Sequence, residues 1–317
     1  MRLVRLERPS RFNWPWPAVT VGNFDGVHRA HQVLVEAARE KAARRGGTAV
    51  ALTFDPHPAR VVDPARAPRA LMTMEQKAEV MAALGVDVLA VLPFGAERAA
   101  QGAEDFARAV LSEQLGARAV VVGTPFRFGR GRAGDAALLS REGAALGFEV
   151  VAVPPVAHGG APISSTRIRQ ALAAGRVEEA SALLGRVFFV DGRVVRGEGR
   201  GRKLGFPTAN LDVVNEMLPA RGVYAAWCRL LDPSAGDRWP AVVNLGRRPT
   251  FGGGDTTLEA HLLDQDRNLY GERLRVEFAA RLRDEQPFPG PQALIEQVGR
   301  DIGRARPLLD EASRRKL

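Results

Sequence analysis

The sequence has one cysteine, few lysines and no long apolar run. The single cysteine, Cys228, excludes an internal disulfide and is typical of a reducing compartment. No apolar stretch approaches the roughly 20 residues that a membrane-spanning helix needs, and the arginine-bearing N-terminus contains no signal-peptide core. We therefore expect a soluble cytoplasmic protein without a membrane partner.

The basic charge is carried almost entirely by arginine. Four lysines stand beside 41 arginines, and the formal net charge is +9. A basic surface attracts nucleic acids. These arginines are scattered along the sequence, however. The binding of free nucleotides explains local basic clusters better than the binding of nucleic acid does. No nucleic-acid partner is expected, whereas self-association is left open.

A length of 317 residues favours two domains. In the first half, β-branched runs alternate with helical patterns, which predicts an open parallel sheet with helices on both faces and ligands at the carboxyl ends of its strands. The expected strands are 18–22, 48–54, 86–94, 117–123 and 148–153, and the expected helices are 32–45, 74–85, 103–116 and 134–147.

The pattern changes after a helical linker at residues 164–185. Short runs separated by Asp, Gly and Pro then predict antiparallel strands that close a small barrel, followed by a terminal helix. We place the boundary so that one domain spans 1–183 and the other 184–317. The expected barrel strands are 186–195, 222–231, 239–246, 256–264 and 272–282, and the helix is 291–317.

The stretch "TVGNFDGVHRAHQ", residues 20–32, places a glycine turn at the carboxyl edge of the sheet. The N–H groups of the turn and of the following helix, which begins near His31, form an anion site. His28 and His31 would add hydrogen-bond donors for phosphate charge that develops during a reaction. The Walker lysine and hydroxyl are absent. Two alternatives remain: surface histidines without a role, or a metal site completed by one of the histidines at 57, 158 and 261.

A second cluster occurs in "PISSTRIRQAL", residues 162–172. Ser164, Ser165 and Thr166 precede a predicted helix, and one of them is expected to cap it. Three hydroxyls followed by Arg167 and Arg169 exceed what a cap needs. They are suited to the outer phosphates of a triphosphate at a helix N-terminus.

These motifs, together with "TFDPHP" (53–58) and "FRFGRGRAGD" (126–135), resemble the nucleotidyltransferase half of the bifunctional bacterial riboflavin kinase/FAD synthetase family. The second half is similar to the riboflavin kinase module of that family. The resemblance spans essentially the whole chain, in order. In the second half, the resemblance rests on the motifs "GRGRKLGFPTANL" (199–211), "GVYAA" (222–226), "NLGRRPTFGG" (244–253), "LEAHLLD" (258–264) and "RLRDEQPFPG" (281–290).

The resemblance implies a Rossmann-like nucleotidyltransferase domain and a riboflavin kinase-like β-barrel. The barrel would phosphorylate riboflavin with ATP and Mg²⁺, and the first domain would transfer AMP from a second ATP to FMN, giving FAD and pyrophosphate. It also implies that His28 and His31 stabilise the α-phosphate. The implied ATP- and flavin-binding residues of this domain are Gly22, Asn23, Phe24, Asp25, Gly26, Ser164, Ser165, Thr166 and Arg167.

In the second half, "GEGRGRKLGFPTAN" (197–210) has the glycines of a phosphate-wrapping loop. Thr208 and Asn210 alternate on an extended segment, so their oxygens point the same way and suit Mg²⁺. The resemblance gives them the metal role. It implies ATP- or flavin-binding roles for Gly201, Lys203, Gly205, Pro207, Thr208 and Asn210.

Glu259 lies in the strand pattern "TTLEAHLLD", with Leu258 and Ala260 on the opposite face. A lone glutamate on a strand usually faces solvent. The resemblance instead makes Glu259 the general base for the riboflavin 5′-hydroxyl. His261, on the same face, would orient it or pack beside it.

Two positions depart from the family pattern. Ala30 stands where H-x-G-H has glycine, and Pro125 stands where relatives usually carry Asp or Asn. Proline offers neither a polar side chain nor an N–H. The alternatives are therefore a kinase with a degenerate N-terminal half, or a flavin-sensing or nucleic-acid-binding regulator. The retained "TAN" and "LEAHLLD" segments disfavour a pure binder.

Overall fold

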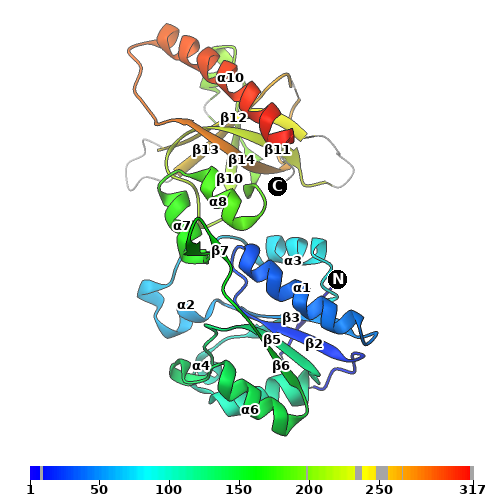
Figure 1. Ribbon diagram of the computed structural model, residues 1–317. Coiled ribbons are helices and arrows are strands. Elements are labelled where there is room, and N and C mark those ends of the chain that lie inside the picture. The colour runs from blue at the N-terminus through cyan, green and yellow to red at the C-terminus, as the bar shows by residue number, and fades with distance from the viewer. Residues whose placement is uncertain (8–9, 198, 233–237, 248–255, 266, 315–317) are drawn as a thin grey trace. The chain divides into compact units, whose positions relative to one another are not determined.

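The computed structural model describes residues 1–317 except 8–9, 198, 233–237, 248–255, 266 and 315–317. The chain forms two compact units, Met1–Ser164 and Ser165–Leu317 (Figure 1). Among the helices in the described ranges, none combines the length and the hydropathy that a bilayer crossing requires.

The first unit contains a six-stranded sheet in which all neighbouring strands are parallel, in the order β1-β4-β3-β2-β5-β6. The chain reverses its direction of travel across the sheet between β2 and β5, so the carboxyl ends of these two strands flank the switch point where such sheets bind ligands. The strands are β1 (Arg2–Arg5), β2 (Pro17–Val21), β3 (Thr48–Asp55), β4 (Val88–Pro93), β5 (Ala119–Gly123) and β6 (Glu149–Val153).

Helices pack on both faces of this sheet, as predicted. Successive residues of β3 enter different cores: Leu52 packs with Leu111 and Leu139 on one face, and Ala51 packs with Val35 and Met81 on the other. The helical segments are α1 (Arg29–Ala43), α2 (Pro58–Val62), η1 (Pro64–Arg66), α3 (Met74–Ala83), α4 (Ala96–Ala100), α5 (Ala103–Phe106), η2 (Ala107–Gln114), η3 (Arg130–Arg132) and α6 (Ala136–Leu146). A small hairpin, β7 (Ala157–His158) and β8 (Ala161–Pro162), follows.

The second unit is a closed six-stranded barrel in the order β10-β13-β12-β11-β14-β9, preceded by two helices. All of its pairs are antiparallel, which confirms the predicted architecture. Its elements are α7 (Ser165–Ala173), α8 (Val177–Leu184), β9 (Phe188–Val195), α9 (Arg200–Lys203), β10 (Ala209–Val213), β11 (Gly222–Leu230), β12 (Arg238–Arg247), β13 (Thr256–Leu262), β14 (Arg273–Arg283) and α10 (Pro291–Arg314).

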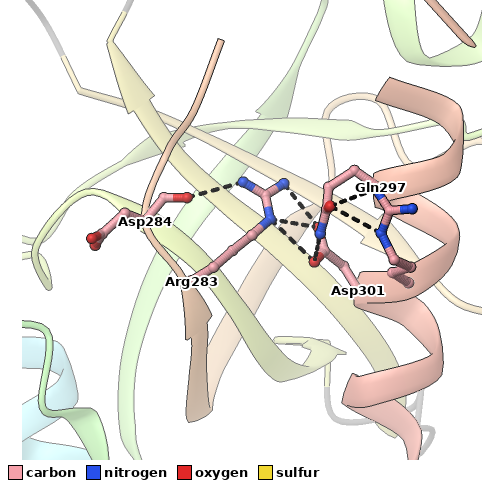
Figure 2. Close-up of polar contacts among 5 residues, drawn as sticks. Arg283, Asp284, Gln297 and Asp301 are labelled. Atoms are coloured by element: carbon pink, nitrogen blue, oxygen red, sulfur yellow. Dashed lines mark hydrogen bonds and ion pairs between the residues drawn. The ribbon is translucent and has the colours of Figure 1, made fainter. Parts of the chain in front are cut away.

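The terminal helix α10 is fastened to β14 by a buried ion pair (Figure 2). The Arg283 guanidinium donates from Nε and Nη2 to Asp301, at 3.1 and 2.8 Å, and Gln297 donates to the same carboxylate. Asp301 is 1% exposed, so its charge depends on Arg283 for compensation. Ala305 and Leu309 of the same helix pack on apolar barrel residues, and α10 thereby covers part of the outer barrel face.

Candidate active sites

The turn between β2 and α1 holds an unusual backbone conformation at the switch point. Phe24 and Val27 have φ values of 46° and 39°, and Gly26 lies between them at 83°. The left-handed region is strained for residues that carry a Cβ, above all for a β-branched valine. The turn therefore needs support from its surroundings.

Buried polar groups supply that support. The Asp25 carboxylate accepts from the backbone N–H of Leu71 at 2.9 and 3.2 Å. The Asn23 carbonyl accepts from the Thr53 hydroxyl at 3.1 Å and from Lys77 Nζ at 2.7 Å. Phe24 is fully buried in the core, so only the backbone of that residue is placed to face a ligand. Phe24 and Asp25, predicted as binding residues, thus shape the turn through their side chains.

His28 and His31 lie together at the start of α1. His28 occupies the N-cap, its Nδ1 accepts from the His31 N–H at 3.4 Å, and the two rings stack with centroids 3.6 Å apart. Since Nδ1 accepts, the neutral His28 ring carries its proton on Nε2, which is the atom able to donate to a phosphate. The helix begins at Arg29, two residues earlier than predicted, because His28 rather than a later residue provides the cap.

His57 joins the same edge of the sheet, although it was predicted only as one candidate for a metal ligand. Its Nδ1 accepts from the N–H of Ala59, and its Nε2 lies 3.1 Å from the side-chain amide of Asn23. The "TFDPHP" motif was the available signal for it. Within the described residues, no group of three or more His, Cys, Asp or Glu side chains is arranged to hold a metal.

The two departures from the family pattern differ in their structural setting. Ala30 lies in the first turn of α1 and is absent from the positive-φ positions, so the helix itself does not require glycine there. Pro125 is exposed just beyond β5, whose carboxyl end flanks the switch point. Pro125 therefore lies near the sheet edge at which open parallel sheets bind ligands.

The hydroxyl cluster belongs partly to the second unit. Helix α7 begins at Ser165, so Ser165 and Thr166 lie in its first turn and do not precede it, which corrects the predicted helix start. The Arg167 guanidinium forms an ion pair with Glu179 of α8 at 3.3 Å. Hydrogen bonds from Arg176 and then Arg167 hold the pKa of Glu179 below its usual value. The triphosphate role of Ser164, Ser165, Thr166 and Arg167 stays a prediction.

In the barrel, strand register aligns three polar side chains. Asn210 of β10 lies directly opposite Glu259 of β13, which lies opposite Asn244 of β12. Directly paired residues project from the same face of a sheet. Leu258 and Ala260, at 1% and 0% exposure, fill the other face, as predicted. Asn244 was missed because no local pattern indicates its cross-strand partner.

His261 is anchored to the segment before β10. Its Nδ1 lies 2.8 Å from the carbonyl of Pro207 and its ring meets Phe206 edge to face. Because a carbonyl only accepts, Nδ1 carries the proton. His261 thereby fixes the backbone that leads into Thr208. A pocket opens beside Thr208, with Arg202, Pro207, Leu262, Asn268 and Tyr270 among its walls.

The glycine loop approaches the two predicted metal ligands closely. A Cβ on Gly197 would overlap the side-chain amide of Asn210, and one on Gly201 would lie 3.2 Å from the Thr208 hydroxyl. Gly199 and Gly205 have φ of 69° and 87°. A hydroxyl and an amide oxygen beneath such a loop fit Mg²⁺, which prefers oxygen ligands. Lys203 ends α9. Residue 198 and residues 248–253 of the quoted motifs lie outside the described ranges.

Fold and sites together define a two-part arrangement: a parallel α/β unit with a glycine-containing turn at its switch point, followed by a closed β-barrel in which a carboxylate lies in one cross-strand row with two asparagines. Comparison with known proteins makes the assignment specific. The FAD synthetase family model matches residues 13–167, and the riboflavin kinase family model matches residues 184–309. The chain belongs to the bifunctional riboflavin kinase/FMN adenylyltransferase family.

Its relatives share the full arrangement. The bifunctional riboflavin kinase/FMN adenylyltransferase of Escherichia coli K12 is 38% identical over 288 residues, 91% of each chain. That of Pseudomonas fluorescens is 38% identical over 316 residues, 99% of this chain and 100% of the relative. A crystal structure described as a macrolide-efflux protein from Streptococcus pneumoniae superposes with a TM-score of 0.86 at 30% identity, covering 96% of this chain and 99% of that one.

Proposed function

We propose that the chain carries out both reactions of its family, with residues 184–317 phosphorylating riboflavin to FMN and residues 1–183 transferring AMP from ATP to FMN. Two successive family models and relatives that align over nearly the whole chain support both activities. The observation that carries the kinase assignment is the cross-strand row of Asn210, Glu259 and Asn244.

In the kinase site, Glu259 accepts the proton of the riboflavin 5′-hydroxyl while that oxygen attacks the γ-phosphorus of ATP. The new P–O bond forms as the bond from the γ-phosphorus to the bridging oxygen breaks, and ADP leaves. Asn210 and Asn244 flank Glu259 on the neighbouring strands and orient its carboxylate. Thr208 and Asn210 would hold Mg²⁺, which would supply neutralisation of the charge on the ATP phosphates. The glycine loop over these two residues, with Gly201, Lys203 and Gly205, surrounds the phosphates.

In the adenylyltransferase site, an FMN phosphate oxygen attacks the α-phosphorus of ATP, a new P–O bond forms, and pyrophosphate leaves. No covalent enzyme intermediate is needed. His28 donates from Nε2 to the charge that builds on the α-phosphate, and the stacked His31 ring holds the His28 ring in place. The turn that includes Gly22, Asn23 and Gly26 supplies backbone donors.

A reducing, cytoplasmic setting fits the one cysteine. Cys228 is fully buried on β11, and burial raises the pKa of its thiol far above the usual value. A thiol held in its neutral form is a poor nucleophile and a poor partner for disulfide exchange.

Product analysis tests the proposal directly. The full chain is incubated with riboflavin, ATP and Mg²⁺, and the flavins are separated by chromatography. We expect FMN followed by FAD. Accumulation of FMN alone would indicate a degenerate first half, and the absence of both products would indicate a flavin-binding regulator.

Replacing Pro125 by Asp or Asn tests whether the switch-point crevice lacks a ligand contact. A restored hydrogen bond is expected to lower KM for ATP or FMN in FAD formation by about 3- to 10-fold. Pro125→Ala, which removes the ring and restores the backbone N–H without adding a polar side chain, is the matched control. Equal KM values for all four proteins would show that this position makes no such contact.

Replacing Gly197 by Ala tests the metal role of Asn210. The added methyl would displace the Asn210 amide, so the Mg²⁺ concentration for half-maximal FMN formation is expected to rise about 10-fold or more. Gly290→Ala is the control, since a Cβ there has open space. An unchanged Mg²⁺ requirement in the Gly197 variant would remove Asn210 from the metal site.

A further inference from the structure

Lys77 is a buried charged residue with no part in the chemistry described so far. It lies on α3, is 7% exposed, and is remote in sequence from the motifs of the adenylyltransferase site. Its Nζ donates to the Asn23 carbonyl at 2.7 Å and is 3.1 Å from the Thr53 hydroxyl oxygen. Thr53 in turn donates to the same Asn23 carbonyl at 3.1 Å. Both groups therefore fasten one peptide of the strained turn.

The peptide bond between Asn23 and Phe24 sets the direction in which the backbone N–H of Phe24 points. The C=O and N–H of a trans peptide point in opposite directions, so a carbonyl held toward Lys77 turns the N–H of Phe24 away from the ammonium. The next residues, Phe24 to Val27, have left-handed φ values at three of four positions and lead directly into the His28 cap. Loss of the anchor at Asn23 would let this backbone relax, and the histidine would move with it.

We propose that Lys77, in its protonated form, is a positioning residue for adenylyl transfer: it anchors the Asn23 carbonyl and so holds the strained turn that presents His28 to the α-phosphate. The inference rests on the adenylyl transfer proposed above. Its positive charge beneath the turn also favours the binding of phosphate.

The electrostatic setting makes this role sensitive to pH. Burial lowers the pKa of Lys77 from 10.5 to about 8, against the opposing attraction of Asp25 in the turn and Asp55 at the end of β3. Asp55 is itself paired with Arg5 of β1 at 3.0 Å. Above about pH 8 the folded protein loses the ammonium, whereas an unfolded chain keeps it to about 10.5. The folded state therefore gains stability from this group as pH rises from about 8 to 10.5, while the anchor is lost.

The first experiment compares Lys77→Met with Lys41→Met, a change at a partly exposed lysine that pairs with Glu149. FAD formation from added FMN is expected to fall about 10- to 100-fold in kcat in the Lys77 variant, because a charged hydrogen bond to the turn is missing. Riboflavin phosphorylation in the same preparation and the Lys41 variant should keep parental rates. A kcat for FAD formation within threefold of the parent would overturn the proposal.

The second experiment uses pH and does not depend on how the Lys77 variant folds. In the parent, kcat for FAD formation should decline as pH rises through about 8. The contribution of Lys77 to the thermal unfolding midpoint should instead be positive and grow as pH rises from about 8 to 10.5. Thr53→Val removes one oxygen that faces the ammonium and should move the decline to lower pH. A flat profile above pH 8 in the parent, or an unshifted decline in Thr53→Val, would refute the role of the protonated amine. A parent that makes no FAD at any pH would instead refute the proposed function.

Discussion

Replacing Glu259 by glutamine is expected to slow FMN formation by about 10²- to 10⁴-fold, the usual worth of a general base. Glutamine keeps the size of the side chain and its place opposite Asn210 and Asn244 across the sheet, but it does not take a proton from the 5′-hydroxyl. Because the missing event belongs to the transition state, the loss should fall on kcat and leave KM for riboflavin nearly unchanged. Initial rates over a range of riboflavin concentrations measure both constants.

Two controls make this result specific to the kinase site. Glu296→Gln changes an exposed glutamate of α10 in the same unit and should have no effect. FAD formation from added FMN should survive in Glu259→Gln, since that reaction uses the turn beside β2. Kinase activity within a few-fold of the parent would show that Glu259 is a solvent-facing residue and not the general base. Parallel loss of both activities would mean that the two halves are not independent.

The sequence predicted the sheet well because its strands are continuous apolar runs. β2 is buried at every position, and β4 at all but its last. β1 escaped prediction for the opposite reason. "RLVR" is short and mostly exposed, and it becomes a strand through parallel pairing with β4, more than 80 residues away along the chain.

The same distinction separates the candidate site residues that the sequence brought together from those that only the fold brings together. His28 and His31 follow a glycine turn in one short stretch, so local spacing placed them together, while their role on the α-phosphate came from the family resemblance and stays a prediction. Lys77 reaches the turn from 54 residues away, and Asn244 meets Glu259 only through strand register. The ion pair of Arg167 with Glu179 on the next helix was likewise not predictable from local sequence, and the phosphate role of Arg167 stays a prediction.

Replacing His28 and His31 together by alanine is expected to abolish measurable FAD formation from added FMN. Loss of one donor to the charge of a transition state commonly costs about 10²- to 10³-fold, and the second change removes the ring that stacks on the first. Riboflavin phosphorylation should remain near normal. Both reactions are followed by chromatography on one preparation, with thermal unfolding recorded alongside.

The double variant also removes the cap of α1, so a structural effect has to be separated from a chemical one. His28→Asn does this, because asparagine is among the best N-cap residues and can still accept from the His31 N–H, while it lacks the ring and its Nε2 donor. If the histidine acts on the α-phosphate, His28→Asn should lose FAD formation about as far as His28→Ala while keeping the thermal midpoint of the parent. If His28→Asn instead restores activity along with stability, His28 serves only as a cap. FAD synthesis that persists in the double variant would exclude both histidines from the mechanism.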